Sequence, residues 1–164
     1  MEKNFVKHIE CYGIEYIIVR PSTVYGEHHD LTTRLITIWT INAMKGLPLV
    51  LYGDEKKTLD FTHVDDFVNG ILLLIIQWDE TKNDDYDICG DDERKLVDVA
   101  KIIMSETGSH AALEYKNPEM AQPQEVNIDI SKLRKFGFDP KIKIEEGVKR
   151  LVNFYKTEGL KWIN

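Results

Sequence analysis

The sequence predicts an α/β fold, because short apolar runs typical of β-strands alternate with longer helical patterns. Residues 16–19 are β-branched or aromatic without polar alternation, which is typical of a strand buried on both faces in a parallel sheet. Helical patterns over residues 2–11 and 31–45 lie on either side of that strand, and Gly13 and Gly46 are placed to end them. The strands are few for the number of helices, so the chain by itself should leave sheet edges bare.

The composition narrows the class of protein. The chain has 164 residues, enough for one ordinary domain with a sizeable core. Its formal net charge of -7 argues against a general nucleic-acid-binding role. Cys11 and Cys89 are far apart without metal-ligand spacing, so we expect two packed thiols and a reducing, cytoplasmic compartment. The N-terminus has no signal-peptide core and the run at residues 71–76 is too short to span a bilayer, so no membrane role is expected.

The first elements suggest a unit that begins upstream. Residues 2–11 carry Phe5 and Ile9 at helical spacing, and a helix followed by a strand is half of a βαβ unit whose leading strand is absent. Pro21 cannot donate to a sheet ladder, so we expect the chain to turn through residues 22–26. A polar turn beyond the carboxyl end of a strand is a candidate ligand wall in an open α/β sheet.

The next helix, over residues 31–45, would carry Arg34 in its first turn. The helix dipole disfavours a cation there, although a basic residue facing a strand end could instead meet an anion. Short extended pieces are expected over residues 47–53 and 59–62.

Thr62 is expected to cap a helix over residues 64–78. This helix is apolar on most of its circumference and should therefore be buried between other elements. Asp65 and Asp66 fall in its favourable first turn, and we expect them, with Asp60, to have structural roles. The remaining pattern predicts strands at 86–89 and 113–115 and helices at 95–107, 131–136 and 144–158.

Four patterns occur in order along the chain: RPSTVYG (residues 20–26), LYGDEKKTLDFTHVDD (51–66), YDICG (86–90) and EVNIDISKLRKFGFDP (125–140). Together they resemble the motifs of the extended short-chain dehydrogenase/reductase family, the NAD-dependent nucleotide-sugar epimerases and dehydratases such as UDP-glucose 4-epimerase. The resemblance covers nearly the whole chain but only the C-terminal half of the family. It implies one region over residues 1–164, in which the late elements of a Rossmann-like NAD-binding fold are interleaved with a small substrate-binding lobe.

The resemblance also implies five substrate-binding positions. Thr23 stands where the family usually has an Asn that touches the sugar nucleotide. Arg34 matches a basic residue that faces the diphosphate. Val50 and Tyr52 match positions that pack on the nucleotide base, and Asp87 matches an Asn that lines the nucleotide pocket.

For the cofactor, the resemblance implies that the backbone at Pro21 and Ser22 lies near the nicotinamide ring of NAD. The family transfers a hydride with the help of a Tyr-x-x-x-Lys pair, and family spacing places that pair just upstream of Met1. The glycine-rich fingerprint that places pyrophosphate at a helix N-terminus is absent as well. We therefore expect no catalytic residue and no metal site in this chain, and NAD binding that needs the missing N-terminal half.

Two departures from the family pattern concern the diphosphate. Leu59 and Gln122 stand where the family has arginines that clamp it, and neither side chain replaces a bidentate arginine. Three interpretations remain open. The chain is the nucleotide-sugar-binding C-terminal portion of an epimerase or dehydratase with a complementary N-terminal half, a noncatalytic nucleotide-binding or assembly module derived from that family, or a homodimer whose second copy covers the bare sheet edge.

Overall fold

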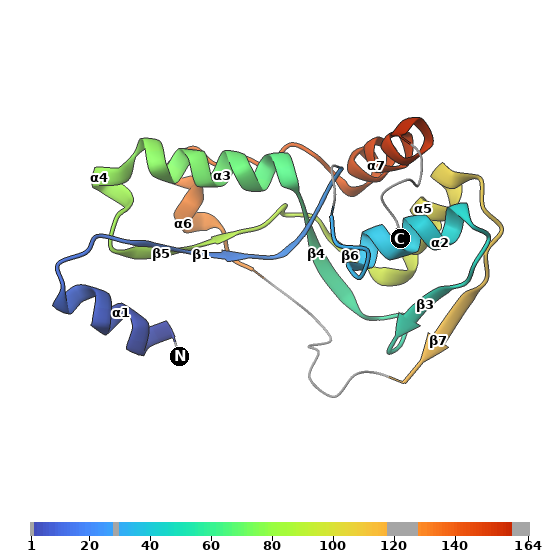
Figure 1. The fold of residues 1–164 in the computed structure, drawn as a ribbon, viewed down its shortest axis with the longest axis horizontal. Helices are drawn as coiled ribbons and strands as arrows, with labels where there is room; N and C mark the ends of the chain where they lie inside the picture. The colour runs from blue at the N-terminus through green and yellow to red at the C-terminus, as the bar shows by residue number, and fades with distance from the viewer. Residues whose placement is uncertain (1, 28–29, 118–127, 159–164) are drawn as a thin grey trace.

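The structure, a computed structural model, describes residues 2–27, 30–117 and 128–158. Its elements form two lobes joined by the long strand β4 (Thr58–His63), as Figure 1 shows. The first lobe contains α1 (Glu2–Cys11), β1 (Ile17–Pro21), α3 (Val64–Ile76), α4 (Trp78–Thr81), β5 (Asp84–Ile88) and α6 (Ser131–Arg134). The second lobe contains α2 (Leu35–Met44), β3 (Leu49–Tyr52), β6 (Glu93–Lys95), α5 (Leu96–Thr107), β7 (Leu113–Lys116) and α7 (Ile144–Glu158), while β2 (Thr23–Tyr25) lies beside β4.

The first lobe is built on a parallel strand pair. β1 and β5 align from Ile17 opposite Asp84 to Pro21 opposite Ile88. Helices α1 and α3 lie on opposite sides of this pair (Figure 1). The side that faces α3 buries a hydrophobic cluster to which β5, α3 and α6 contribute. Gly70 lets α3 approach β5 closely, because an added Cβ would lie 3.0 Å from the Ile88 side chain.

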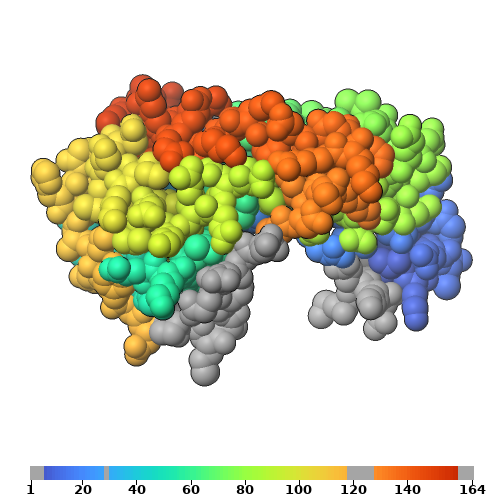
Figure 2. Space-filling model, turned by 180° about the vertical axis from the view of Figure 1, so that it is seen from behind, coloured from blue at the N-terminus to red at the C-terminus, as the bar shows by residue number. Residues whose placement is uncertain are grey.

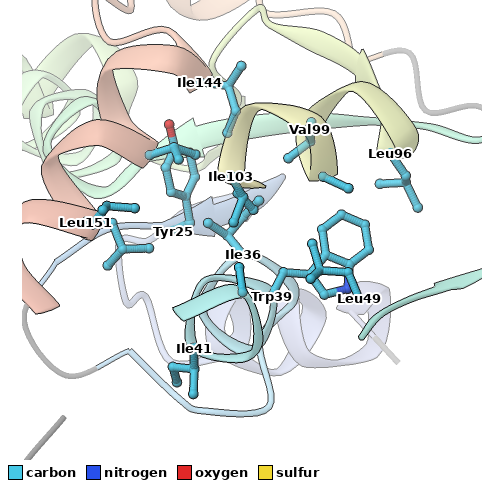
Figure 3. Packing of buried hydrophobic residues seen from close by; sticks show 14 of the residues in the cluster. Tyr25, Ile36, Trp39, Ile41, Leu49, Leu96, Val99, Ile103, Ile144 and Leu151 are labelled. Carbon is cyan, nitrogen blue, oxygen red and sulfur yellow. The ribbon is translucent and has the colours of Figure 1, made fainter. Parts of the chain in front are cut away.

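The second lobe contains the larger hydrophobic cluster, with side chains from α2, β3, α5 and α7 (Figure 3). Trp39 is fully buried in it and donates its indole N–H to the Val50 carbonyl oxygen at 3.0 Å, which ties α2 to β3. β3 pairs in parallel with β7, while β4 has β2 as a parallel neighbour and β6 as an antiparallel one. Gly147 leaves room for Tyr25, since an added Cβ would lie 2.1 Å from the Tyr25 hydroxyl oxygen.

The predicted α/β class is confirmed, and most predicted elements are present with ends shifted by a few residues. The first departure is at residues 22–26, where we expected a turn and Thr23–Tyr25 form β2, because they pair in parallel with residues 61–63 of β4. The second is α2, which begins at Leu35 rather than 31. Asp30 accepts hydrogen bonds from the Leu31 amide and the Thr37 hydroxyl, and this holds residues 31–34 in a turn ahead of the helix.

Helix α3 begins at Val64 as predicted, but its cap residue and its C-terminal end differ from the prediction. Its N-cap is His63 rather than Thr62, since the His63 Nδ1 accepts from the Asp65 amide at 3.2 Å. It ends at Ile76, because Gln77 leaves the helical conformation before α4 begins. The expected burial of α3 on most of its circumference is also wrong, since a set of its apolar residues is exposed.

Two predictions of burial need correction. β1 was expected to be buried on both faces, but its residues are half-buried or exposed, because within the described chain β1 has a strand neighbour on one edge only. Cys89 is a buried thiol as expected, whereas Cys11 is exposed at the end of α1. No helix among the described residues is both long enough and apolar enough to cross a membrane.

Candidate functional site

The turn between β1 and β2 lies at the carboxyl ends of the parallel strands. Pro21 ends β1 opposite Ile88, which ends β5, and the Ser22 amide donates to the Ile88 carbonyl oxygen at 3.2 Å. Thr23 then begins β2 and is half-buried. The structure therefore brings Pro21, Ser22 and Thr23 to the edge at which open α/β sheets bind ligands.

The buried carboxylate of Asp60 joins two loops at this edge. It accepts hydrogen bonds from the Ser22 hydroxyl at 2.9 Å and from the amides of Gly90 and Asp92 at 3.0 Å each. The Thr62 hydroxyl contacts the Ser22 hydroxyl from the same strand. One side chain of β4 thus fixes both the loop after β1 and the loop after β5, which confirms the predicted structural role of Asp60.

Two further carboxylates continue this bracing toward α7. Asp66 accepts from the amides of Lys141 and Ile142, at 3.0 and 2.8 Å. Asp92 is buried and accepts from the Ile144 amide at 2.8 Å, at the first residue of α7. The loops of the candidate site are therefore connected to the N-terminus of α7 by buried carboxylate–amide hydrogen bonds, which are stronger than bonds between neutral groups.

His63, the histidine of this region, is fully buried and has a structural role. Its Nδ1 accepts from the Asp65 amide, so Nε2 carries the hydrogen and donates to Glu27 at 2.8 Å. Its ring meets the Tyr25 ring edge-on at 5.5 Å. Burial raises the pKa of the Tyr25 hydroxyl, which has no hydrogen-bond partner among the described residues and is therefore not a proton donor to an open site.

Arg34 is the N-cap residue of α2, one position ahead of the predicted first turn. Its side chain is exposed, and its guanidinium makes no hydrogen bond or ion pair with the described part of the chain. The first turn of α2 holds no acidic residue of its own, while the Asp30 carboxylate just ahead of the helix accepts from the Thr37 hydroxyl and offsets part of the positive charge of the helix N-terminus. Arg34 is therefore placed where an anion would be stabilised by both the guanidinium and the helix end.

Val50 and Tyr52 lie on β3, which α2 contacts through Trp39. Val50 is half-buried, and Tyr52 is 38% exposed at the end of the strand. An aromatic ring at an exposed strand end is able to stack on a base. The structure thus places Arg34, Val50 and Tyr52 in the second lobe.

Asp87 lies in the first lobe, on β5, opposite Arg20 of β1. An Arg20 guanidinium nitrogen lies 2.6 Å from Asp85 and 3.9 Å from Asp87. The same part of the strand pair lines a cavity of about 380 Å³ between β1, β5 and α1, which also includes Lys7 and Glu10. Sequence reasoning missed this cavity, because its charged lining is contributed by segments far apart in the chain.

Figure 2 shows the molecule from behind, with the red and orange residues of its C-terminal region lying across the top of both lobes. The predicted positions fall on both lobes. Pro21, Ser22, Thr23 and Asp87 belong to the strand ends of the first lobe and its junction with β4, while Arg34, Val50 and Tyr52 belong to the second.

The cation opposite Leu59 does not replace the family arginine at that position. Leu59 packs against the second-lobe hydrophobic cluster. Arg94 lies directly opposite on β6, but its guanidinium is bound to Asp92 at 2.8 Å and to Glu145 at 3.2 Å. Gln122 lies outside the described residues. Among the predicted site residues, Arg34 is therefore the cation on which the expected diphosphate contact depends.

Pro21 and Ser22 fit the predicted NAD contact only in part. The Ser22 hydroxyl is bound to Asp60 and its amide to the Ile88 carbonyl, so neither donor is available. These residues offer a surface against which a ring could lie. NAD itself supplies the hydride-accepting nicotinamide in this family, and a glycine-rich turn for its pyrophosphate is not present in the sequence.

Cys89 provides a test of packing next to Asp60. Burial raises the pKa of the Cys89 thiol to about 11, so at pH 8 only about one thiol in a thousand would be ionised. We expect a thiol reagent at pH 8 to modify the exposed Cys11 quickly and Cys89 slowly, with the Cys89 rate rising as the pH approaches 11. Mass spectrometry of the Cys11→Ser variant measures Cys89 alone, and rapid modification of that variant at pH 8 would show that the strand end is open.

Parallel strands with helices on both sides and a candidate site at their carboxyl ends place the chain in the class of Rossmann-like α/β proteins. The model of the NAD dependent epimerase/dehydratase family matches residues 1–89. The chain belongs to that family.

Individual relatives agree with this assignment. A protein of Methanocaldococcus jannaschii assigned as a UDP-glucose 4-epimerase is 33% identical over 90% of this chain and 48% of its own length. The UDP-glucose 4-epimerase of Thermotoga maritima, solved with UDP-glucose, superposes with a TM-score of 0.85 and 25% identity over 96% of this chain and 51% of its own. The dTDP-glucose 4,6-dehydratase of Bacillus anthracis, solved with NAD, gives a TM-score of 0.86 and 25% identity over 98% and 50%. The chain thus spans about half the length of these relatives.

Proposed function

We propose that this chain is the nucleotide-sugar-binding, C-terminal portion of an NAD-dependent sugar-nucleotide epimerase or dehydratase. It would bind the nucleotide between its lobes, while a complementary N-terminal half holds NAD and supplies the catalytic Tyr and Lys. Its exposed Cys11 and buried Cys89 are both free thiols, which suits a reducing compartment such as the cytoplasm.

The observation that carries this proposal is the bracing by Asp60. In a parallel strand pair the loops after the two strands form the wall of the ligand crevice, and here a single buried carboxylate fixes both of them. The Thr23 position follows directly on one braced loop, and Arg34 offers, at a helix N-terminus, a guanidinium with no hydrogen bond or ion pair to the described residues. A diphosphate matches that guanidinium in charge and geometry.

Titration with UDP-glucose tests this proposal through Arg34. We expect Arg34→Ala to weaken binding about tenfold or more, because a charge-assisted hydrogen bond contributes roughly 1.5–3 kcal/mol. Binding is measured by calorimetry on the folded variant, with circular dichroism to confirm that α2 is intact.

Lys45→Ala is the matched control, since Lys45 is an exposed cation at the opposite end of the same helix. It removes the same charge and should leave the affinity within about twofold. Equal affinities for the wild type and Arg34→Ala would overturn the assignment of Arg34 to the diphosphate.

A second candidate function is a noncatalytic module that kept the nucleotide pocket. Leu59 favours this second candidate. Its side chain packs against the second-lobe hydrophobic cluster and cannot make the diphosphate contact that an arginine makes at this position in the family. Turnover of UDP-glucose or dTDP-glucose after addition of the complementary half and NAD would decide for the enzyme. Nucleotide binding by the assembled pair without turnover would decide for the module.

A further inference from the structure

The sheet formed by β3 and β7 has one face on the core and one open face. The two strands lie side by side in the second lobe (Figure 1). Leu49 and Leu51 of β3 are fully buried in the second-lobe hydrophobic cluster. Side chains alternate between the two faces of a strand, so Val50 and Tyr52 point away from that cluster. The open face therefore carries the two positions predicted to pack on the nucleotide base.

Strand β7 adds a cation to this open face. The register of the parallel pair sets Lys116 opposite Tyr52, and residues paired in this way lie on the same face. Leu113, three residues earlier on β7, packs against the hydrophobic cluster, as alternation along the strand requires. Neighbouring strands are about 4.8 Å apart, a gap that a lysine side chain spans. Lys116 is exposed and makes no side-chain hydrogen bond or ion pair with the described residues.

Arg34 lies at the same end of the second lobe. Helix α2 and strand β3 run in opposite directions, as two hydrogen bonds show. The Asn42 side chain donates to the Pro48 carbonyl oxygen at 3.2 Å. Trp39, earlier in the helix, donates to Val50, later in the strand. A helix of ten residues and a strand of four are about 15 and 13 Å long, so the N-terminus of α2 lies near the C-terminal end of β3.

We propose that Lys116 is a second cation for the diphosphate of the nucleotide sugar and binds it together with Arg34. This inference rests on the proposed function, because it adds a contact to the same site. A base stacked on Tyr52 leaves the phosphates at the end of the sheet, where both cations lie. A lysine ammonium binds phosphate as a point charge on a flexible stem, so it does not need the fixed geometry of an arginine.

The charges around Lys116 support an anion at this end of the sheet. The chain has a formal net charge of -7, so a diphosphate needs cations close to it to offset the general repulsion. Glu114 lies on the same open face, opposite Val50, and would repel a phosphate placed there. The charge pattern of β7 therefore favours a phosphate beside Lys116 rather than across the middle of the sheet.

Calorimetric titration with UDP-glucose tests the role of Lys116. Lys116→Met keeps the length of the side chain and removes its charge, and it should weaken binding about fivefold or more. Lys116→Arg keeps the charge and should stay within about twofold of the wild type. The loss in Lys116→Met should shrink in about 0.5 M salt, because screening weakens the ion pair that the substitution removes. The unfolding temperatures of the three proteins should agree, since Lys116 is exposed.

Lys56→Met is the matched control. Lys56 is another exposed lysine near the end of β3, in the turn that follows the strand, and its variant should bind UDP-glucose within about twofold of the wild type. Uridine is the control on the ligand side, because it has the base and ribose but no phosphate. Its affinity, measured by NMR titration, should be the same for the wild type and Lys116→Met.

Three results would overturn the role of Lys116. Equal losses in Lys116→Met and Lys56→Met would show a general effect of charge. Equal losses for uridine and UDP-glucose would place Lys116 at the base or ribose. Weaker binding in Arg34→Ala together with wild-type binding in Lys116→Met would refute Lys116 alone and leave the proposed function intact. A wild-type chain that does not bind UDP-glucose would instead refute the proposed function, and this inference with it.

Discussion

Replacement of Gly90 by Ala is expected to destabilise the fold by about 3 kcal/mol or more. A Cβ at Gly90 would lie 2.0 Å from the Phe61 carbonyl oxygen, a backbone atom of β4. Relief of this clash requires the loop after β5 to move away from β4. The same shift would break the hydrogen bond from the Gly90 amide to Asp60. Chemical denaturation followed by circular dichroism measures the loss.

Gly70→Ala is the control for that substitution. Its added Cβ would meet side-chain rather than backbone atoms, those of Ile88 and Phe138 at 3.0–3.2 Å, so that a shift of a few tenths of an ångström would relieve the contact. The higher helix propensity of Ala, worth about 1 kcal/mol, also offsets part of the strain. A Gly90→Ala protein as stable as Gly70→Ala would contradict the close approach of these segments.

Asp60→Ala should cost about 3–5 kcal/mol, because it removes the shared acceptor of four donors and each buried unsatisfied group costs about 1–3 kcal/mol. The donors are the hydroxyls of Ser22 and Thr62 and the amides of Gly90 and Asp92. Both loops of the candidate site should loosen together, so UDP-glucose affinity should fall along with stability. Thermal unfolding and calorimetry on the same preparation measure the two effects.

Asp60→Asn keeps the shape of the side chain but loses one acceptor oxygen, so its loss of stability should be intermediate. Asp79→Ala serves as the control, since the Asp79 side chain is 94% exposed and its ion pair with Lys82 lies in solvent. Wild-type stability and affinity in Asp60→Ala would mean that the two loops are fixed by other contacts.

Long elements with a clear apolar stripe were predictable from the sequence. Helix α7 spans the residues expected, because Val148, Leu151, Val152 and Tyr155 follow its period and are all buried. The strands β2 and β6 were not predicted, since three-residue strands carry no period of their own and exist through pairing with β4. The hydrophobic periodicity of the sequence therefore predicts the helices better than the short strands.

The candidate site was predictable only in its parts. The expected structural role of Asp60 was correct, but its partners Gly90 and Asp92 lie 30 and 32 residues further along the chain, a distance that no local pattern spans. The wrong prediction of Thr62 as the helix cap has a similar cause. Both Thr62 and His63 can accept a hydrogen bond, and only the fold directs Thr62 toward Ser22 and leaves His63 to cap the helix. The exposed flank of α3 was mistaken for core, since apolar composition alone does not distinguish an exposed helix face from a buried one.

The most direct test of the account is a parallel calorimetric titration of the isolated chain with UDP-glucose, dTDP-glucose and NAD. We expect saturable binding of at least one of the two sugar nucleotides and none of NAD, since the proposed nucleotide contacts lie in this chain and the sequence has no glycine-rich fingerprint for the cofactor pyrophosphate. Saturable binding of NAD, or failure to bind either sugar nucleotide, would contradict it.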